Sequence, residues 1–313
     1  MPNIQVPRRG SMQYYPRKKS KRAFARVRYV PEGEQIVEFA GYKAGMTHIT
    51  IIDGRPNSQT KGEEVSFSVT VVVCLSRGYR NNIAFKDIMA EHLERHLAKR
   101  IRLPKKKGAG FEALEGCERL TLLVQTQPYL TGIGKKAPEV FEVALGGSKD
   151  HQLARARELL GKEVAVNSVF ADGQQVDIHA ITKGKGYQGP VKRFGIGLRA
   201  HKSEKTKRGP GSLGPWCGQG HVMYRVAHAG QMGYHQRMEL NKWVVQIGSD
   251  PKKINPKGGF VRYGFVKNPY VLLKGSVPGC AKRMLRLTKA VRPNRKIHHE
   301  APSIEYISLE SKQ

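Results

Sequence analysis

Short runs of apolar residues, separated by Gly, Pro and charged residues, dominate the hydrophobic pattern of this chain. Alternation of apolar and polar positions, or a short apolar run bounded by turn residues, predicts a β-strand. On this basis we expect strands within 36–52, 65–75, 119–127, 139–145, 174–182, 243–248, 259–266, 270–277, 284–288 and 304–308. Many short strands split by Gly and Pro predict a β-barrel or β-sandwich body.

Two segments show the spacing of an amphipathic helix instead. In residues 83–101 the apolar positions recur every three or four residues, which places them on one face. The second segment covers 148–160, with Ser148 as the N-cap and Gly161 as the stop signal. We expect both helices to belong to an insertion on the β body, so the chain is predicted to be mainly β with an α insertion.

Two further segments show neither period. Residues 1–28 are rich in Pro, Lys, Arg and Ser, and cannot bury enough apolar surface to fold without a partner. Residues 183–242 are rich in Gly, Lys, Arg, His and aromatic residues, and a loop of that length is usually functional or disordered. The predicted division is an extended basic arm (1–30), a first body part (31–76), an α/β insertion (77–163), one body strand (164–182), a basic finger loop (183–242) and a second body part with a tail (243–313).

The charge distribution follows the same division. The chain of 313 residues carries a net charge of +30, but residues 32–177 hold 20 basic and 19 acidic residues and are nearly neutral. Residues 1–28 hold nine basic residues and no acid, and residues 178–313 hold 26 basic residues against six acids. Because such blocks attract polyanions, we expect the flanks of the chain to be nucleic-acid-binding arms.

Metal and membrane chemistry find little support in the sequence. The four cysteines form no C-x-x-C pair, so we expect reduced thiols and no metal, although Cys217 and His221 have a tolerable ligand spacing. His92 and His96 lack the glutamate of a zincin motif, and we interpret them as part of a solvated or RNA-facing helix surface. With no signal-peptide core and no apolar run long enough to span a bilayer, the expected location is the cytoplasm.

The stretch Gly184-Lys185-Gly186-Tyr187-Gln188-Gly189 fits the G-x-G-x-x-G pattern of dinucleotide-binding loops. Such a loop needs a preceding strand, a helix directly after it and an acid about 20 residues later. We expect Pro190 to exclude the helix, and Glu204 lies in a solvated basic run. A Walker loop fails as well, since no G-K-[ST] closes the pattern. A nucleotide-dependent enzyme is therefore the weaker interpretation, and neither a catalytic constellation nor a cofactor is expected.

An RNA-binding role explains more of the same residues. Cations can pair with phosphates, glycine allows close backbone approach, and rings such as Trp216 can stack on unpaired bases. The candidate RNA-binding residues are Arg8, Arg9, Arg17, Lys18, Lys19, Lys21, Arg22, Lys183, Lys185, Lys192, Arg193, Arg199, Lys202, Lys205, Lys207, Arg208, Trp216, His221, Arg225, His235, Arg237 and Lys242. A basic protein that compacts DNA stays open as an alternative, but a loop rich in Gly, Pro and Trp suits indifferent coating of a duplex poorly.

Several long motifs, in a consistent order, resemble one family. GYKAGMTH at 41–48, TKGKGYQGPVKRFG at 182–195, LGPW at 213–216, AGQMGYHQRMELNK at 229–242 and GGFVRYGFVKNPYVLLKGSVPG at 258–279 carry the resemblance, with AVRPN at 290–294. They are similar to the universal large-subunit ribosomal protein three, in its archaeal and eukaryotic branch. The resemblance runs from about Pro7 to the end and is least distinctive over 77–163.

The resemblance implies a specific fold and function. The fold is a β-barrel body of the translation-protein type, with an N-terminal extension and a central finger loop. The function is that of a non-catalytic constituent of the large ribosomal subunit, which binds large-subunit rRNA early in assembly beside neighbouring ribosomal proteins. The N-terminal extension and the finger loop then reach into the rRNA toward the peptidyl transferase centre. Trp216 takes the place of the finger-tip tryptophan, which lies near the aminoacyl-tRNA entry region. A histidine that some members methylate, twelve residues before this Trp, is Glu204 here, so that modification is not expected.

Overall fold

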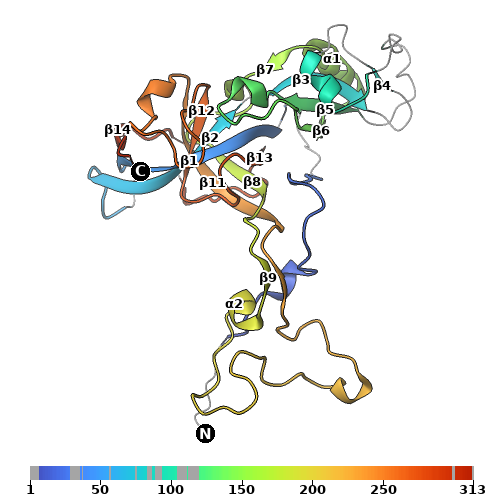
Figure 1. The fold of residues 1–313 in the computed structure, drawn as a ribbon. Helices are drawn as coiled ribbons and strands as arrows, with labels where there is room; N and C mark the ends of the chain where they lie inside the picture. Colours follow the sequence, from blue (N-terminus) through green and yellow to red (C-terminus); the bar gives the residue numbers. More distant parts are fainter. Residues whose placement is uncertain are drawn as a thin grey trace. The chain divides into compact units, whose positions relative to one another are not determined.

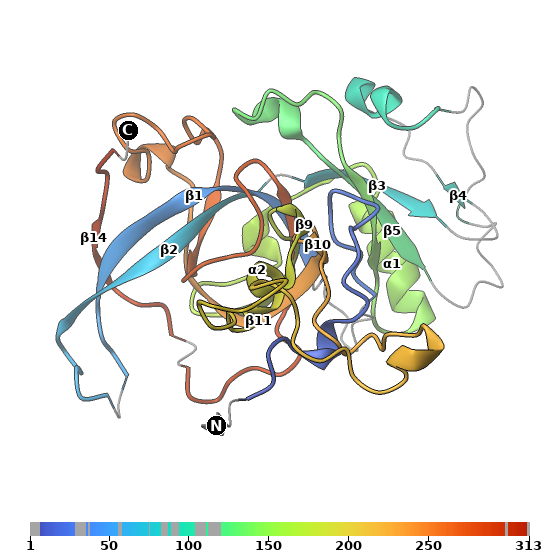
Figure 2. The same cartoon turned by 60° about the horizontal axis from the view of Figure 1, so that its bottom comes forward.

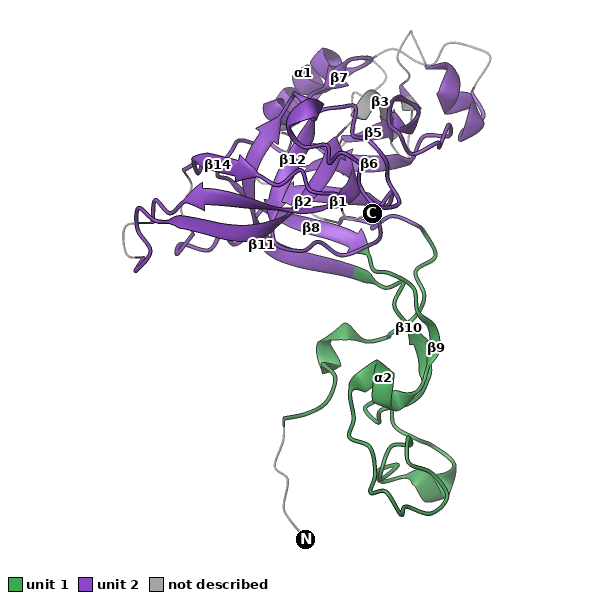
Figure 3. Ribbon diagram, turned by 60° about the vertical axis from the view of Figure 1, so that its left-hand side comes forward, with its two compact units in different colours: residues 1–22, 181–236 green, residues 23–180, 237–313 purple. Residues whose placement is uncertain are grey.

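The computed structural model of the chain describes residues 7–28, 36, 38–55, 58–74, 76–82, 87–88, 94–103, 111, 120–297 and 300–311. Over these residues it contains fourteen strands and two α-helices, so the mainly β prediction is confirmed (Figure 1). The chain divides into two compact units (Figure 3). The larger unit comprises 23–180 and 237–313, and the smaller unit comprises 1–22 and 181–236.

A seven-stranded antiparallel sheet forms the body of the larger unit. Its strands, in spatial order, are β13 (Met284–Lys289), β8 (Gln175–Ile181), β11 (Gln236–Gly248), β12 (Tyr270–Lys274), β2 (Glu64–Cys74), β1 (Glu38–Ile52) and β14 (Ile304–Ile307). β13 also pairs with β1, from Glu38 opposite Thr288 to Tyr42 opposite Met284, which links six strands into a continuous cycle. β1 and β2 run side by side as a long hairpin (Figure 2).

A second sheet belongs to the same unit. Its order is β4 (Asp87–Ile88), β3 (Ser76–Asn82), β5 (Thr121–Thr126) and β6 (Val140–Ala144), and β7 (Glu163–Val164) also pairs with β3. Helix α1 (Lys149–Leu159) begins where predicted, because the hydroxyl of Ser148 accepts a hydrogen bond from the amide of His151. It ends before Gly161, which adopts a φ of +80°.

Single 3₁₀ turns complete the described structure. They are η1 (Met12–Tyr14), η2 (Arg95–Lys99), η4 (Pro128–Leu130), η5 (Val166–Ser168), η6 (Cys217–Gln219) and η7 (Pro251–Lys253). No helix in the described part of the chain is both long and apolar enough to cross a membrane.

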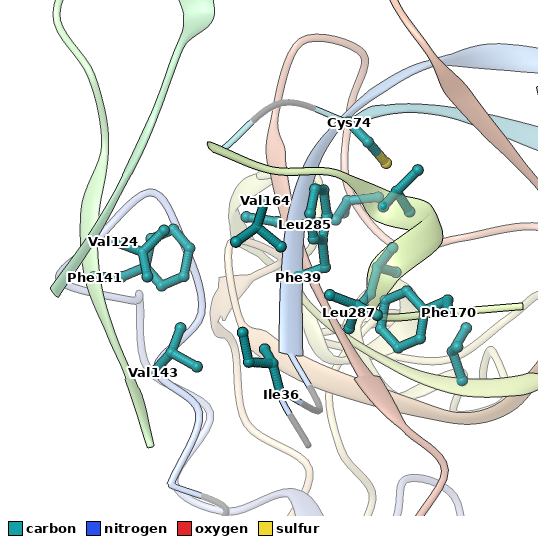
Figure 4. Close-up of a cluster of buried hydrophobic side chains, with 14 of the residues drawn as sticks. Ile36, Phe39, Cys74, Val124, Phe141, Val143, Val164, Phe170, Leu285 and Leu287 are labelled. Carbon is teal, nitrogen blue, oxygen red and sulfur yellow. The ribbon is translucent and has the colours of Figure 1, made fainter. Parts of the chain in front are cut away.

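Apolar side chains from both sheets pack into one core. Phe39, Leu285 and Leu287 of the body lie in the same buried cluster as Phe141 and Val143 of the second sheet (Figure 4). A further cluster, around Val71 and Leu272, fills the rest of the body. Burial of this apolar area is the main stabilising contribution to the fold.

Two polar contacts are buried in the core of the larger unit. The Tyr42 hydroxyl lies 2.8 Å from the hydroxyl oxygen of Thr126 and donates to the carboxylate of Glu139 at 2.7 Å. The Arg286 guanidinium pairs with the carboxylate of Glu38, and both side chains are buried. The Tyr42 contacts join β1 of the body to the second sheet, and Arg286 adds a link by donating to the Glu142 carbonyl of β6 at 2.7 Å. A buried charge without a partner is very unfavourable, so Glu38 and Arg286 stabilise each other in the body.

Three secondary-structure predictions are wrong, and each has a local reason. Where 83–101 is described it contains no α-helix: the short strand β4 buries Ile88 and the 3₁₀ helix η2 buries Leu97, so apolar spacing alone misassigned these residues. Residues 83–86 and 89–93 lie outside the described residues. Residues 259–266 form a turn with one isolated bridge, because Arg262 and Gly264 take positive φ. β11 begins at Gln236, earlier than the predicted 243.

The cysteine and histidine residues that were weighed as metal ligands have the following surroundings. Cys74, Cys217 and Cys280 carry free thiols, whereas Cys117 lies outside the described residues, as does His92. The His96 ring stacks on the Tyr129 ring, with 4.3 Å between centroids. Within the ranges given above, no group of three or more His, Cys, Asp or Glu side chains is placed to hold a metal ion.

Candidate nucleic-acid interface

A two-stranded ribbon and a short helix organise the glycine-rich stretch of the smaller unit. β9 (Gly186–Gln188) pairs antiparallel with β10 (Gly230–Met232), and α2 (Pro190–Phe194) follows directly. The expectation that Pro190 excludes a helix is wrong, because proline suits the first helical position, where no amide donor is needed. α2 ends after five residues at Gly195, which has a φ of +69°. A dinucleotide loop needs a parallel βαβ unit, and this antiparallel ribbon does not provide one.

At Gly233 the two legs of the ribbon lie too close together for a side chain. A Cβ atom placed there would lie 2.0 Å from the carbonyl oxygen of Lys183, and the residue has a φ of +73°. Only glycine fits both conditions without strain. The legs are joined by hydrogen bonds from the Tyr234 amide to the Lys183 carbonyl, at 3.2 Å, and from the Lys185 amide to the Met232 carbonyl, at 2.9 Å.

The N-terminal arm packs on these legs within the same unit. The Ser20 amide donates to the Tyr234 carbonyl at 2.9 Å, and a ring nitrogen of His235 lies 2.9 Å from the Lys18 carbonyl oxygen. Farther along, an Arg8 guanidinium nitrogen donates to the Arg225 carbonyl at 2.6 Å. Within the smaller unit, residues 8–20 of the arm therefore contact the finger loop, while the expectation that the arm orders only against another molecule stays a prediction.

Two of the predicted RNA-binding arginines hold this arrangement together. The Arg17 guanidinium carbon lies 4.5 Å from the centroid of the Phe194 ring, and that of Arg193 lies 5.1 Å from it. Arg193 also donates to the carbonyls of Gln231, at 3.1 Å, and His228, at 2.9 Å. Burial, and secondly the charge of Arg17, lower the pKa of Arg193. Both guanidinium groups are engaged inside the chain and are less accessible to phosphates than their neighbours.

Most of the remaining candidates are exposed cations of the smaller unit. This unit holds 17 Lys or Arg residues and one acid, Glu204. The exposed candidates are Arg8, Arg9, Lys18, Lys19, Lys21, Arg22, Lys183, Lys185, Lys192, Arg199, Lys202, Lys205, Lys207, Arg208, Trp216, His221 and Arg225. A cation density of this kind, with so few acids, creates a strongly positive surface potential.

Exposed rings accompany the cations. Trp216 is 61% exposed and has a positive φ of 71°, so its backbone turns sharply before η6. Tyr224 is 68% exposed. Tyr187, which follows Lys185 and Gly186 in the glycine motif, is 77% exposed. Tyr187 was not among the predicted site residues, although an aromatic residue beside glycine and lysine was the available signal.

The other predicted residues are placed differently. His235 is buried, with its ring nitrogen against the arm as described above. Arg237 and Lys242 belong to the larger unit, on β11, and the Lys242 ammonium lies 2.8 Å from the Glu239 carboxylate. The cations that a ligand could reach most easily in the smaller unit are therefore those of the preceding exposed set.

Comparison with known proteins decides the family. A sequence model of the family Ribosomal protein L3 matches residues 1–109 and 109–313. The chain belongs to this family. A large ribosomal subunit protein uL3 from Methanothrix thermoacetophila is 44% identical, over 100% of this chain and 99% of that protein. Proteins of the same name are 45% identical in Archaeoglobus fulgidus, over 98% of each chain, and 41% identical in Methanocaldococcus jannaschii, over 99% of this chain and 98% of that one.

Membership of the family resolves the question raised by the glycine pattern. Relatives over the full length of the chain carry the names of ribosomal proteins, and the family is named for one. The chain is thus a ribosomal protein rather than an enzyme that uses residues 184–189 to hold a nucleotide. Gly186 of that stretch instead begins strand β9 of the antiparallel ribbon, and Lys185 beside it is exposed.

Proposed function

We propose that this chain is a structural constituent of the large ribosomal subunit, and that its smaller unit binds large-subunit rRNA. The relatives named above are proteins of the large subunit, which supports the first part. The observation that carries the second part is the smaller unit itself, with 17 Lys or Arg residues against one acid. In a folded unit this cation density causes self-repulsion, which a polyphosphate relieves.

Binding would be driven mainly by the release of counterions from the RNA. Each phosphate that a Lys or Arg neutralises contributes about −0.9 to the slope of log affinity against log salt on a duplex, and about −0.7 on a single strand. Lys183 and Lys185 precede β9 and Lys192 lies in α2; all three are exposed, and we assign them to phosphates. Exposed Tyr187, Trp216 and Tyr224 would stack on unpaired bases, which distinguishes folded RNA from a DNA duplex.

The finer features of the family also belong to this proposal. The closed cycle of six strands supports a β-barrel of the translation-protein type as the body. Residues 183–242 would act as the finger loop, and residues 1–30 as the N-terminal arm, docked early in subunit assembly in the cytoplasm. The exposed Trp216 would lie toward the peptidyl transferase centre and affect it indirectly, through the position of rRNA. Neighbouring ribosomal proteins are the other partners.

A charge-reversal experiment tests the proposed RNA surface. We expect the triple variant Lys183→Glu, Lys185→Glu, Lys192→Glu to bind a large-subunit rRNA fragment with a salt slope reduced by about two to three, and to fail to enter subunits. The matched control reverses Lys252, Lys253 and Lys257, three exposed lysines of the larger unit. Equal losses in both variants would mean that only net charge matters, and an excess of duplex DNA that displaces the RNA equally well would favour a DNA-binding role.

A further inference from the structure

Residues of the larger unit form a pocket of about 530 Å³. The β1–β2 hairpin, the first half of β11, the end of β12 and residues 296–297 and 300–303 line it. Its volume lies in the range of pockets that hold one small ligand. The residues of this pocket are outside the predicted site except Lys242, so neither the sequence motifs nor the proposed rRNA surface accounts for it.

Two aromatic rings and an ammonium group define the chemistry of the pocket. Phe67 and Trp243 lie with their ring centroids 6.5 Å apart and their planes tilted by 37°. The Lys274 ammonium lies 4.5 Å from the Phe67 centroid and 5.5 Å from the Trp243 centroid. The indole N–H of Trp243 donates to the Gly173 carbonyl at 2.9 Å, which fixes the orientation of its ring. Ile52, Val65 and Leu240 add an apolar lining.

Four cations line the pocket, Arg55, Lys242, Lys274 and Lys296, against two acids, Asp53 and Glu300, which leaves an excess of cations. Asp53 is engaged by its neighbours: it accepts from the Arg55 guanidinium at 2.6 Å and from the Thr60 hydroxyl at 2.7 Å. Those hydrogen bonds, Arg55 first, hold the pKa of Asp53 well below its usual range. Lys274 makes no ion pair with a carboxylate among the residues that the structure describes.

Desolvation by surrounding residues, and secondly the charge of Arg55, lower the pKa of Lys274. A partly desolvated ammonium is stabilised more by a bound anion than a fully hydrated ammonium is, because the anion offsets the hydration that the charged form has lost. Rings provide faces for a planar group, and the ammonium provides a partner for a phosphate next to it.

We propose that this pocket binds one unpaired nucleotide of RNA, with the base against Phe67 and Trp243 and the adjoining phosphate on Lys274. This inference rests on the proposed rRNA-binding function and extends it to a second site, on the larger unit. An apolar side chain next to a carboxylate, from a protein partner, is the competing occupant. The excess of cations and the two neighbouring rings favour the nucleotide, because every base offers a flat face while its phosphate supplies the charge.

The fluorescence of Trp243 can report binding in this pocket. The chain has two tryptophans, and Trp216→Phe leaves Trp243 as the single one. We expect AMP, GMP, CMP or UMP to quench Trp243 fluorescence saturably in the Trp216→Phe chain, at millimolar concentrations typical of a small fragment. Ribose 5-phosphate and inorganic phosphate, which lack a base, should leave the signal unchanged. A short single-stranded RNA should quench at lower concentration than the same RNA with abasic sites.

Matched variants identify the pocket as the source of the signal. Lys274→Gln, in the same background, should weaken the quenching about tenfold, because it removes one charge-assisted contact. Lys257→Gln, at an exposed lysine outside the pocket, should leave it unchanged. Absence of saturable quenching by nucleotides and by RNA overturns the proposal. So does quenching by an acidic, Phe-containing peptide in place of nucleotides, which would identify a protein partner.

A second measurement separates this proposal from the rRNA-binding function on which it rests. The wild-type chain and Lys274→Gln are compared for binding to a large-subunit rRNA fragment as salt is varied. If nucleotides fail to quench while rRNA still binds through the exposed finger lysines, the pocket proposal falls and the proposed function stands. If neither nucleotides nor the rRNA fragment bind, both fall. Quenching lost in Lys274→Gln, with the salt slope reduced by at most about one, supports the pocket.

Discussion

Gly233 provides the sharpest test of how the finger loop is built. Replacement by Ala adds a Cβ atom at a φ of +73°, where its position is 2.0 Å from the Lys183 carbonyl oxygen. The left-handed conformation alone costs about 1–2 kcal/mol in a residue with a side chain. Relief of the clash requires the two legs to separate, which breaks the hydrogen bonds of the Tyr234 and Lys185 amides. Each contributes about 1 kcal/mol, so the total loss is about 3–4 kcal/mol.

Gly195 is the matched control for this substitution. It has nearly the same φ, +69°, but nothing lies within 4 Å of the position of a Cβ atom. Gly195→Ala therefore includes the conformational cost without the clash, and should lose only about 1–2 kcal/mol. The difference of about 2 kcal/mol between the variants isolates the contact of the two legs.

Amide hydrogen exchange measures that difference at the residues concerned. In Gly233→Ala, the amides of Lys185 and Tyr234 should exchange about 30-fold faster than in Gly195→Ala, since 1.4 kcal/mol corresponds to a factor of ten. Amides of β1 and β13, in the larger unit, serve as internal references and should be unchanged. Equal exchange rates in the two alanine variants would refute the argument that the close approach at Gly233 holds the legs together.

Three further outcomes follow from named contacts. Desolvation raises the pKa of Glu38 from 4.5 to about 6, against the charge of Arg286, so the folded chain holds a proton that the unfolded chain releases. The free energy of unfolding should therefore fall as pH rises from 4.5 through 6, and denaturant unfolding of Glu38→Gln should lack this dependence. Phe194→Ala removes the ring that the Arg17 guanidinium contacts, and should weaken the contact of the N-terminal arm with the finger loop by about 2–4 kcal/mol. Trypsin should then cleave faster after Arg17, and an unchanged cleavage rate would contradict this prediction. The Trp216→Ala chain should still enter subunits but alter aminoacyl-tRNA accommodation, because about 1–3 kcal/mol of base stacking is lost. Unchanged chemical probing of the rRNA near the peptidyl transferase centre would contradict this prediction.

Local patterns predicted those elements whose stabilising contacts are near in sequence. Helix α1 was predicted from its N-cap at Ser148 and its stop at Gly161, and both features act within one turn of the helix. β5, β6 and β8 followed from their apolar patterns. The same method failed over 83–101, because apolar residues at helical spacing can also be buried from a short strand and a 3₁₀ turn, as Ile88 and Leu97 are.

In the candidate site, too, the sequence predicted some features and missed those that depend on distant contacts. Exposed lysines such as Lys183 and Lys185 were predicted from charge and composition alone. Arg17 and Arg193 have the same composition signal, yet their guanidinium groups lie against Phe194 and cap carbonyls within the smaller unit. Charge in a sequence reports how many cations there are, but whether a cation faces solvent depends on residues that approach it from far along the chain.

By itself the sequence determined the mainly β class, the positive flanks around a neutral middle, and the family resemblance that comparison confirmed, since all three are properties of composition or of ordered motifs. Only the tertiary structure decided that β1 pairs with β13, that the arm lies on the finger loop, and that Phe67, Trp243 and Lys274 line one pocket. These features join residues that are distant along the chain. Their formation depends on how the whole fold buries its apolar surface, which no local pattern encodes.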